Sequence, residues 1–380
     1  MCRKIKKILK KYYLFLNDKT IKTRFSFDAE YERWKEYNKN RKDVGIIEEN
    51  KQEKPSIYFL VPGVKISGGI AVIFKHANEL LKRGYSVKIL SLAQKNDNSW
   101  YSNQRVEIVP YSKTRKILKS GKIDILFATA YSTAFTVDMA NAKRKLYFIQ
   151  SDESRFFPED KDLCDKIKQT YTLPLEYVVT VSWMKEWLKN DYGKETYHVP
   201  LGLDLDIFKK TEPILPKVNK SRILIEGAID VPYKGMDDAY SVLKDLECEL
   251  WIISNNGKPK KGWKYDRFFE NVPMEKMPEI YSSCDILLKM SKVESFSYPP
   301  LEMMACGGAS VIKKVTGIEE YAVDGENCLI VEDVEGSKRA VQRLMEDGEL
   351  RERLIENGYQ TAKEWGWERS IDLLERIMRL

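Results

Sequence analysis

Short runs of consecutive apolar residues alternate with amphipathic stretches along most of the chain. The first run, "IYFLV" at residues 57–61, precedes "IAVIFKHANELLKRG", in which apolar residues recur at steps of three and four. Successive apolar positions are typical of strands buried on both faces, and the longer spacing is typical of a helix with one buried face. The pattern therefore predicts an α/β fold in which helices connect parallel strands.

The predicted strands form two series separated by "HVPLGLDLDIFKKTEPILPKVNK". This stretch concentrates proline, glycine and charge between Pro200 and Val218, so we expect a domain boundary there. The apolar runs lie at residues 57–61, 85–92, 106–111, 123–129, 145–150 and 176–182 in the first series and at 222–228, 248–254, 285–291, 309–315 and 327–333 in the second. Two doubly wound, Rossmann-like units facing a cleft are predicted, with ligands bound beyond the carboxyl ends of the strands.

These boundaries give four expected parts. A basic amphipathic helical extension and linker occupies residues 1–54, and the first Rossmann-like domain occupies residues 55–204. The second domain follows at 205–362, and a C-terminal helix at 363–380 is expected to cross back to the first domain.

The N-terminal extension holds the charge imbalance of the chain. The 380 residues carry a net charge of +7, and residues 1–24 alone contain nine Lys or Arg and one Asp. Because the rest of the chain is near neutral, a nucleic-acid-binding surface is not expected. Apolar residues follow a helical spacing in "MCRKIKKILKKYYLFLND", so this helix either lies on an anionic membrane surface or packs on the protein itself.

Composition limits the location and the chemistry. No apolar run is long enough to span a bilayer and no secretory signal is present, so we expect a cytoplasmic protein, peripheral on the inner face of the cell membrane. Six scattered cysteines without a C-x-x-C pair and only two histidines argue against a metal site.

Two glycine-containing segments follow predicted first strands of the two units. Gly68 and Gly69 lie between strand and helix, where they serve either as a structural turn or as a close approach for phosphate. Lys234 precedes Gly235 at the corresponding place in the second unit, where it is either a surface lysine or a cation for phosphate oxygens.

The stretch "VESFSYPPLEMMACGGAS" contains two glutamates eight positions apart. Pro299 and Pro300 predict a helix start, which places Glu294 in the preceding loop and Glu302 in the first turns of the helix. The unpaired N–H groups of such a loop and helix start form a site for a diphosphate, and the carboxylates accept hydrogen bonds from sugar hydroxyls. The alternative is a pair of solvated residues at a helix start.

The order of these pieces resembles the retaining glycosyltransferases of family 4. The resemblance runs from about residue 56 to the C-terminus and implies the GT-B fold. It rests on the Gly68-Gly69 loop, Lys234-Gly235 and the Glu294-x7-Glu302 spacing, together with "VVTVSWMKEWLKNDYG", "HVPLGLDLDIFK" and "GELRERLIENGYQTAKEWGWERSIDLLERIM".

The resemblance implies roles for the two glutamates and the lysine. Glu302 would receive the ribose hydroxyls of a nucleotide-sugar donor, and Glu294 would contact the sugar near its reacting carbon. Lys234 would neutralise charge on the leaving diphosphate. The family transfers with retention and needs neither a metal nor a cofactor besides its UDP-, GDP- or dTDP-sugar donor.

The resemblance also implies which backbone groups hold the diphosphate. They belong to Phe296, Ser297 and Tyr298 and to the helix start that follows, while the Gly68-Gly69 loop would join Lys234 in neutralising the charge that develops. The acceptor, a glycan or a lipid-linked molecule, would face the first domain.

One position near the end of the first strand of the second unit departs from the family pattern. Family members commonly carry an arginine two residues after the equivalent of Glu226, where this chain has Ala228. Related rhamnosyltransferases of surface polysaccharide assembly share such an opening, which adds dTDP-rhamnose to the donors considered.

The segment "FIQSDESRFF", at the end of a predicted first-domain strand, would face the acceptor side of the cleft. Its acceptor-side candidates are Asp152, Glu153 and Arg155, and the alternative is that they are surface residues of a loop.

Two further readings stay open at this stage. One is a GT-B enzyme of different chemistry, such as a nucleotide-sugar epimerase. The other is a membrane-recruited glycan-binding or partner protein whose donor site is vestigial, a reading that Ala228 favours.

Overall fold

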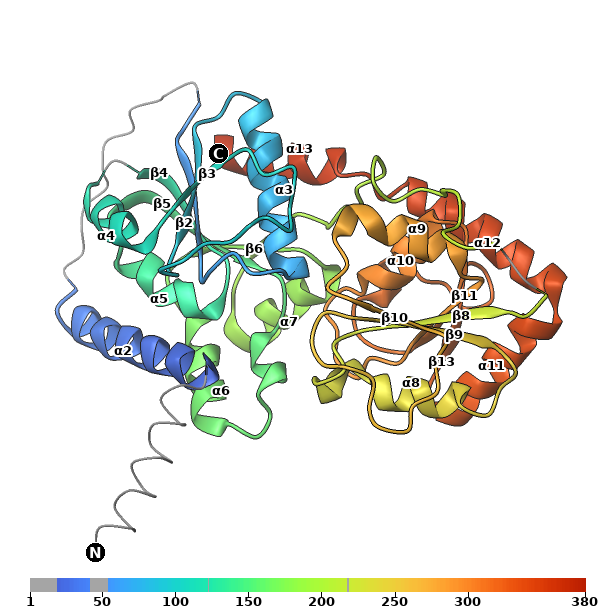
Figure 1. Cartoon of the computed structure of the whole chain (residues 1–380). Coiled ribbons are helices and arrows are strands. Elements are labelled where there is room, and N and C mark those ends of the chain that lie inside the picture. Colours follow the sequence, from blue (N-terminus) through green and yellow to red (C-terminus); the bar gives the residue numbers. More distant parts are fainter. Residues whose placement is uncertain (1–18, 42–53, 122, 217–218) are drawn as a thin grey trace, which may run out of the picture.

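The computed structural model describes residues 19–41, 54–121, 123–216 and 219–380, and it divides into two domains, each built on one parallel sheet (Figure 1). The sheet of the first domain has the strand order β3-β2-β1-β4-β5-β6-β7. Its strands are β1 (Ile57–Val61), β2 (Val87–Ser91), β3 (Glu107–Val109), β4 (Ile123–Ala128), β5 (Ala142–Ile149), β6 (Glu176–Val179) and β7 (Thr196–His198).

The sheet of the second domain has the strand order β10-β9-β8-β11-β12-β13, and all its pairs are parallel. Its strands are β8 (Arg222–Glu226), β9 (Glu249–Ser254), β10 (Arg267–Glu270), β11 (Ile286–Lys289), β12 (Ala309–Lys313) and β13 (Leu329–Val331). In both sheets the first strand in sequence lies in the middle, so the chain winds outward in both directions.

Helices connect most successive strands and cover the sheets, but β3 follows β2 and β10 follows β9 without a helix between them (Figure 1). The α-helices of the first domain are α3 (Gly68–Lys82), α4 (Tyr111–Lys119), α5 (Tyr131–Met139), α6 (Lys161–Thr170) and α7 (Ser182–Tyr192), after an N-terminal α2 (Lys19–Lys39). The α-helices after the first domain are α8 (Met236–Leu243), α9 (Met277–Ser283), α10 (Tyr298–Ala305), α11 (Val334–Glu346), α12 (Gly348–Lys363) and α13 (Glu368–Arg379). Short 3-10 turns are η1 (Glu153–Phe156), η2 (Pro232–Lys234), η3 (Met274–Lys276) and η4 (Ile318–Glu320).

The N-terminal helix α2 packs along the first domain beside α5 and α6 (Figure 1). Phe27 and Trp34 are buried, and the Trp34 indole N–H donates to the buried Asp138 carboxylate at 2.8 Å. Aromatic contacts with Phe135 at 4.8 to 5.7 Å between ring centroids add to this interface. The predicted amphipathic helix, residues 1–18, lies outside the described residues.

The C-terminal helix α13 leaves the second domain and lies against α3 of the first (Figure 1). Its Glu375 accepts hydrogen bonds from Arg83 at 2.6 Å and from Tyr85 at 2.9 Å. The buried His76 ring contacts Ser370 at 3.0 Å on the same helix. The two domains are thus joined twice, by the segment after β7 and by the segment before α13.

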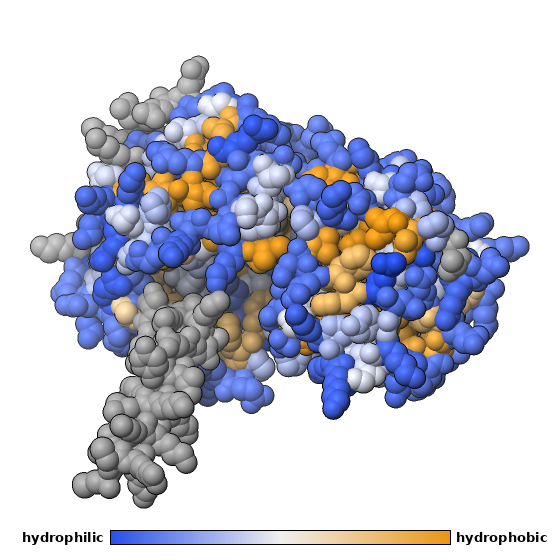
Figure 2. Space-filling view, viewed as in Figure 1, coloured by the Kyte–Doolittle hydropathy of each residue, from blue (hydrophilic) through white to orange (hydrophobic). Residues whose placement is uncertain are grey.

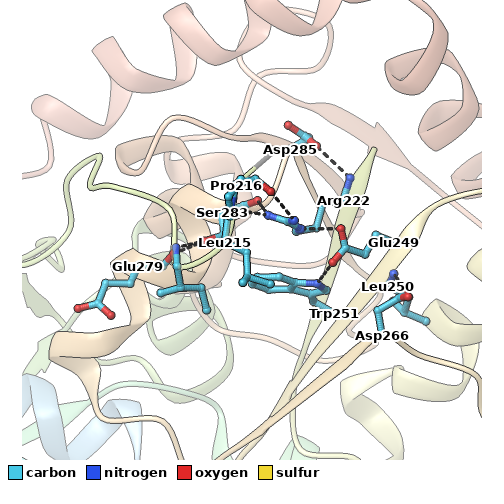
Figure 3. A network of polar contacts seen from close by, with 11 residues as sticks. Leu215, Pro216, Arg222, Glu249, Leu250, Trp251, Asp266, Glu279, Ser283 and Asp285 are labelled. Carbon is cyan, nitrogen blue, oxygen red and sulfur yellow. Dashed lines mark hydrogen bonds and ion pairs between the residues drawn. The ribbon is translucent and has the colours of Figure 1, made fainter. Parts of the chain in front are cut away.

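A buried arginine fixes the first of these connections to the second sheet (Figure 3). Arg222 at the start of β8 pairs with Glu249 at 2.9 Å and stacks on Trp251, 4.4 Å from the ring centroid. It also donates to the carbonyl oxygens of Pro216 and Ser283. Because this network lies at the amino ends of the strands, it stabilises the domain from the side opposite the carboxyl ends.

Apolar residues form the interior of both domains, and the face shown in Figure 2 is mostly hydrophilic, with separate apolar patches, some of them where the domains meet. Among the described residues, no helix is both long enough and apolar enough to cross a bilayer.

Candidate functional site

A cleft of about 720 Å³ lies between the two domains. From the first domain it is lined by residues directly after β1, β4 and β5, namely Pro62, Thr129 and Gln150. From the second domain it is lined by the ends of β8 and β11 and by Asn255 after β9. The carboxyl ends of both sheets therefore face one space, as the doubly wound topology requires of a binding site.

The glycine pair forms the first turn of α3 rather than a loop before it. Ser67 is the N-cap residue, and its hydroxyl accepts the Ile70 N–H at 3.3 Å. Gly68 and Gly69 follow as the first helical residues, and both line the cleft. A Cβ on Gly68 would meet nothing within 4 Å, so the backbone there borders open space. The start of a 15-residue helix thus offers unpaired N–H groups to the cleft.

Lys234 and Glu294 form an ion pair in the cleft. The ammonium group of Lys234 donates to both carboxylate oxygens of Glu294, at 2.8 and 3.0 Å. Gly235 follows with φ +66°, and a Cβ there would lie 1.9 Å from the carbonyl oxygen of Met290. Only glycine fits here, because the backbone of residue 235 lies directly against the chain that follows β11. This close contact fixes the position of the neighbouring Lys234.

Glu302 lies on α10, where it is partly buried and lines the cleft. Its carboxyl group accepts a hydrogen bond from the Tyr281 hydroxyl at 2.8 Å. Burial raises the pKa of Glu302 to about 8, and the nearby Glu226 carboxylate adds to the rise. At neutral pH the side chain is mainly a neutral acid that can both donate and accept a hydrogen bond.

The segment before α10 brings aromatic rings and the helix start to the same place. Phe296 and Tyr298 line the cleft, and the Tyr298 hydroxyl donates to the carbonyl oxygen of Gly202 at 3.2 Å. Ser297 lies between them as the N-cap residue, without lining the cleft. Its hydroxyl is buried and has no hydrogen-bond partner among the described residues.

The three acceptor-side candidates occupy different places. Glu153 lines the cleft, where its carboxylate accepts hydrogen bonds from the Tyr131 N–H at 2.7 Å and the Tyr147 hydroxyl at 3.0 Å. Burial raises the pKa of Glu153 to about 7. Asp152 and Arg155 lie outside the cleft lining: Asp152 caps η1, and Arg155 reaches across to the second domain.

A second ion pair in the cleft was not among the predicted site residues. Lys289 at the end of β11 donates to the carboxylate and to the carbonyl oxygen of Glu226 at the end of β8, both at 2.8 Å. Lys289 lies inside an apolar run of the sequence, so it does not stand out as a site residue. The pair can be predicted only when the strand register is known, because the register places the charged ends of β8 and β11 side by side. Ala228 lines the same part of the cleft.

Acidic, cysteine and histidine side chains do not gather into a metal-binding arrangement within the described part of the chain. No group of three or more such residues is close enough to hold a metal ion there.

Comparison with known protein families gives one match in the second domain. Residues 264–361 match the family described as Glycosyl transferases group 1. This segment includes Glu294, Glu302 and Lys289, so the match covers the second-domain side of the cleft.

Two of the similar proteins are named for O-antigen synthesis. The O-antigen biosynthesis protein RfbC of Myxococcus xanthus is 25% identical over 266 residues, which cover 67% of this chain and 20% of that protein. The O-antigen chain mannosyltransferase B of Escherichia coli is 29% identical over 119 residues, which cover 31% of this chain and 30% of that protein. In matches of this kind the chain spans about half or less of its relatives' length.

A solved structure shares the fold along nearly its whole length. HepE of Anabaena, determined in complex with UDP-glucose, has a TM-score of 0.68 at 13% identity, covering 86% of this chain and 100% of HepE. The predicted α/β fold class, two Rossmann-like sheets facing a cleft in the GT-B arrangement, is confirmed.

Proposed function

We propose that this chain is a metal-independent, retaining glycosyltransferase that moves a sugar from a nucleotide-diphosphate donor to a glycan. The observation that carries the proposal is the convergence of Glu294, Glu302 and Lys234 with the start of α3 in one interdomain cleft. The group 1 glycosyltransferase match over residues 264–361 and the O-antigen relatives support the reaction class.

The donor binds mainly to the second domain. Glu302 bonds the ribose hydroxyls, and its neutral form at neutral pH suits a group that both donates and accepts. The diphosphate lies against the backbone at Phe296 and Tyr298, which line the cleft on either side of Ser297, with the start of α3 opposite. Glu294 faces the hydroxyls of the transferred sugar while it stays paired with Lys234.

The reaction breaks the bond between the anomeric carbon and the diphosphate oxygen. The leaving diphosphate takes the bonding electron pair, and Lys234 and the helix starts stabilise the charge that develops on it. The acceptor hydroxyl attacks from the same face, and its proton passes to the departing phosphate oxygen. This route retains the anomeric configuration and requires neither a separate base nor a metal ion.

The acceptor enters from the first domain, beside Glu153. That carboxylate is the one acceptor-side candidate that lines the cleft, and it faces a hydroxyl-bearing acceptor such as a surface or lipid-linked glycan. A hexose or deoxyhexose on UDP, GDP or dTDP is the donor class, and dTDP-rhamnose belongs to it.

The site assignment is tested by replacing Glu302. We expect Glu302→Ala to weaken donor binding about 10- to 100-fold, because each lost hydrogen bond to a polar partner costs about 1 to 3 kcal/mol. Binding of UDP-, GDP- and dTDP-sugars is measured by calorimetry, transfer by product formation with and without EDTA, and the anomer by NMR. Glu332→Ala, on the exposed surface, is the control. Unchanged binding in Glu302→Ala would refute the assignment.

The membrane contact of the N-terminus is tested separately. Deleting residues 1–18 removes the segment predicted to be a basic helix and leaves α2 in place. We expect sedimentation with phosphatidylglycerol vesicles to fall severalfold while nucleotide binding is unchanged, because each Lys or Arg near an anionic surface contributes about 1 kcal/mol. Equal sedimentation of the shortened and full chains would argue that this segment packs elsewhere.

A further inference from the structure

The carboxyl ends of β8 and β11 bring an acid and a base together inside the cleft. Ile225 of β8 pairs with Leu288 of β11, so the next residues of the two strands, Glu226 and Lys289, stand side by side. Both line the cleft. The Lys289 ammonium group contacts the Glu226 carboxylate and its carbonyl oxygen, each at 2.8 Å.

Lys289 is far more buried than an ordinary lysine. Its side chain is 4% exposed, against 22% for its partner Glu226. Burial alone would lower the pKa of this ammonium group, but Glu226 and the more distant Glu294 and Glu302 outweigh burial and raise it. The group is therefore a permanent positive charge at neutral pH.

A buried ion pair costs desolvation of both ions, and two apolar residues at these strand ends would fill the space without that cost. An ammonium group has three N–H donors, and two acceptors for it are found among the described residues. Lys289 lines the cleft, so its third N–H donor is available to a ligand there.

The charge of the cleft also calls for a second cation. On the second-domain side, Glu226 and Glu294 each face a lysine, and Glu302 is mainly neutral at neutral pH; on the first-domain side, Lys75 is paired with Asp204. A diphosphate that enters this cleft brings further negative charge into a partly buried place, where it needs cations or N–H dipoles. Ala228, on the same side of the cleft, supplies none.

We propose that Lys289 is a second cation that contacts the diphosphate of the donor, and that Glu226 positions it. The inference rests on the proposed function, since it assumes a diphosphate in this cleft. In this proposal Lys289, at the end of β11, supplies a positive charge that Ala228 cannot supply.

The test compares nucleoside diphosphates with monophosphates. Affinities of UDP, GDP and dTDP and of UMP, GMP and dTMP are measured by calorimetry for the wild type and for Lys289→Met. The ratio of diphosphate to monophosphate affinity should fall about 10-fold or more in Lys289→Met, since the lost contact is charge-assisted. Lys292→Met removes a lysine that is paired with Asp238 on the surface, and it should leave the ratio within about 2-fold.

A double variant separates binding from folding. Lys289→Met alone leaves Glu226 without its partner and can lower stability, whereas Glu226→Gln with Lys289→Met leaves no unpaired charge. The same loss of diphosphate preference in the folded double variant supports the inference. Glu226→Gln alone keeps the cation and should keep the preference.

Two outcomes overturn the inference in distinguishable ways. If the wild type prefers diphosphates and both Lys289 variants keep that preference, Lys289 only neutralises Glu226, and the proposed function stands. If the wild type binds none of the three diphosphates, the proposed function fails and this inference fails with it.

Discussion

Two carboxyl groups in the cleft have pKa values that are set mainly by burial. Glu302 and Glu153 have pKa values raised from 4.5 to about 8 and about 7, and burial is the main cause for each. Both carboxyl groups accept hydrogen bonds from tyrosine hydroxyls, which oppose the rise without cancelling it. A neutral carboxyl group in a sugar-binding cleft can donate to a hydroxyl, which a carboxylate cannot.

This burial predicts a pH-dependent stability. Between pH 4.5 and about 8 the folded chain holds a proton on Glu302 that the unfolded chain releases. The free energy of unfolding therefore falls as pH rises through this window, by up to ~1.4 kcal/mol per pH unit from this group. Glu302→Gln keeps a neutral side chain and should flatten the slope, which urea unfolding at pH 5 to 9 measures. An identical slope in wild type and variant would mean that Glu302 is ionised in the folded chain.

Residue spacing along the sequence predicts part of the site. Glu294 and Glu302 stand at the helix start that Pro299 and Pro300 predict, so their place follows from local rules. The Glu226–Lys289 pair joins residues 63 positions apart and follows from strand register. The burial of Glu302 beneath Tyr281 likewise depends on packing that no local pattern contains.

Elements show the same division between local and long-range information. Strands with consecutive apolar residues were predicted, but β7 and β10 were missed. Both are edge strands of three and four residues, and none of their residues is fully buried, so they leave no apolar run in the sequence. The start of α3 at Gly68 was placed late, because two glycines are unusual in a first helical turn.

The turn between η2 and α8 gives a prediction at the level of elements. Gly235 and Gly193 both have φ near +65°, but a Cβ on Gly235 would meet the Met290 carbonyl oxygen, whereas one on Gly193 would meet nothing within 4 Å. Gly193→Ala should cost only the backbone strain of about 1 kcal/mol. Gly235→Ala should cost more and also displace Lys234, weakening nucleoside diphosphate binding. Urea unfolding and calorimetry measure both effects, and equal results for the two variants would contradict the role given to Gly235.

At the scale of the whole molecule, side chains of the first domain hold the segment that carries Glu294. The Ser151 hydroxyl contacts that of Ser295 at 2.5 Å, and the Trp183 indole N–H donates to the Ser295 carbonyl oxygen at 3.3 Å. Arg155 donates to the Thr316 hydroxyl at 2.9 Å. These contacts cross the cleft beside the site, so the relative position of the domains and the position of Glu294 are coupled.

Arg155 is the residue at which this coupling can be tested. It stacks on Trp183 and reaches Thr316, whose hydroxyl in turn donates to the Glu294 carbonyl oxygen at 2.8 Å. In Arg155→Ala we expect the domains to separate more readily, because a side-chain contact between them beside the site is lost. Small-angle scattering should show a larger radius of gyration, and kcat should fall severalfold while affinity for the nucleoside diphosphate changes little. Arg105→Ala, on the exposed surface of the first domain, is the control. A radius of gyration and a kcat that match the control would show that Arg155 does not hold the domains together, and the coupling would then rest on the other contacts between them, including those of Ser151 and Trp183.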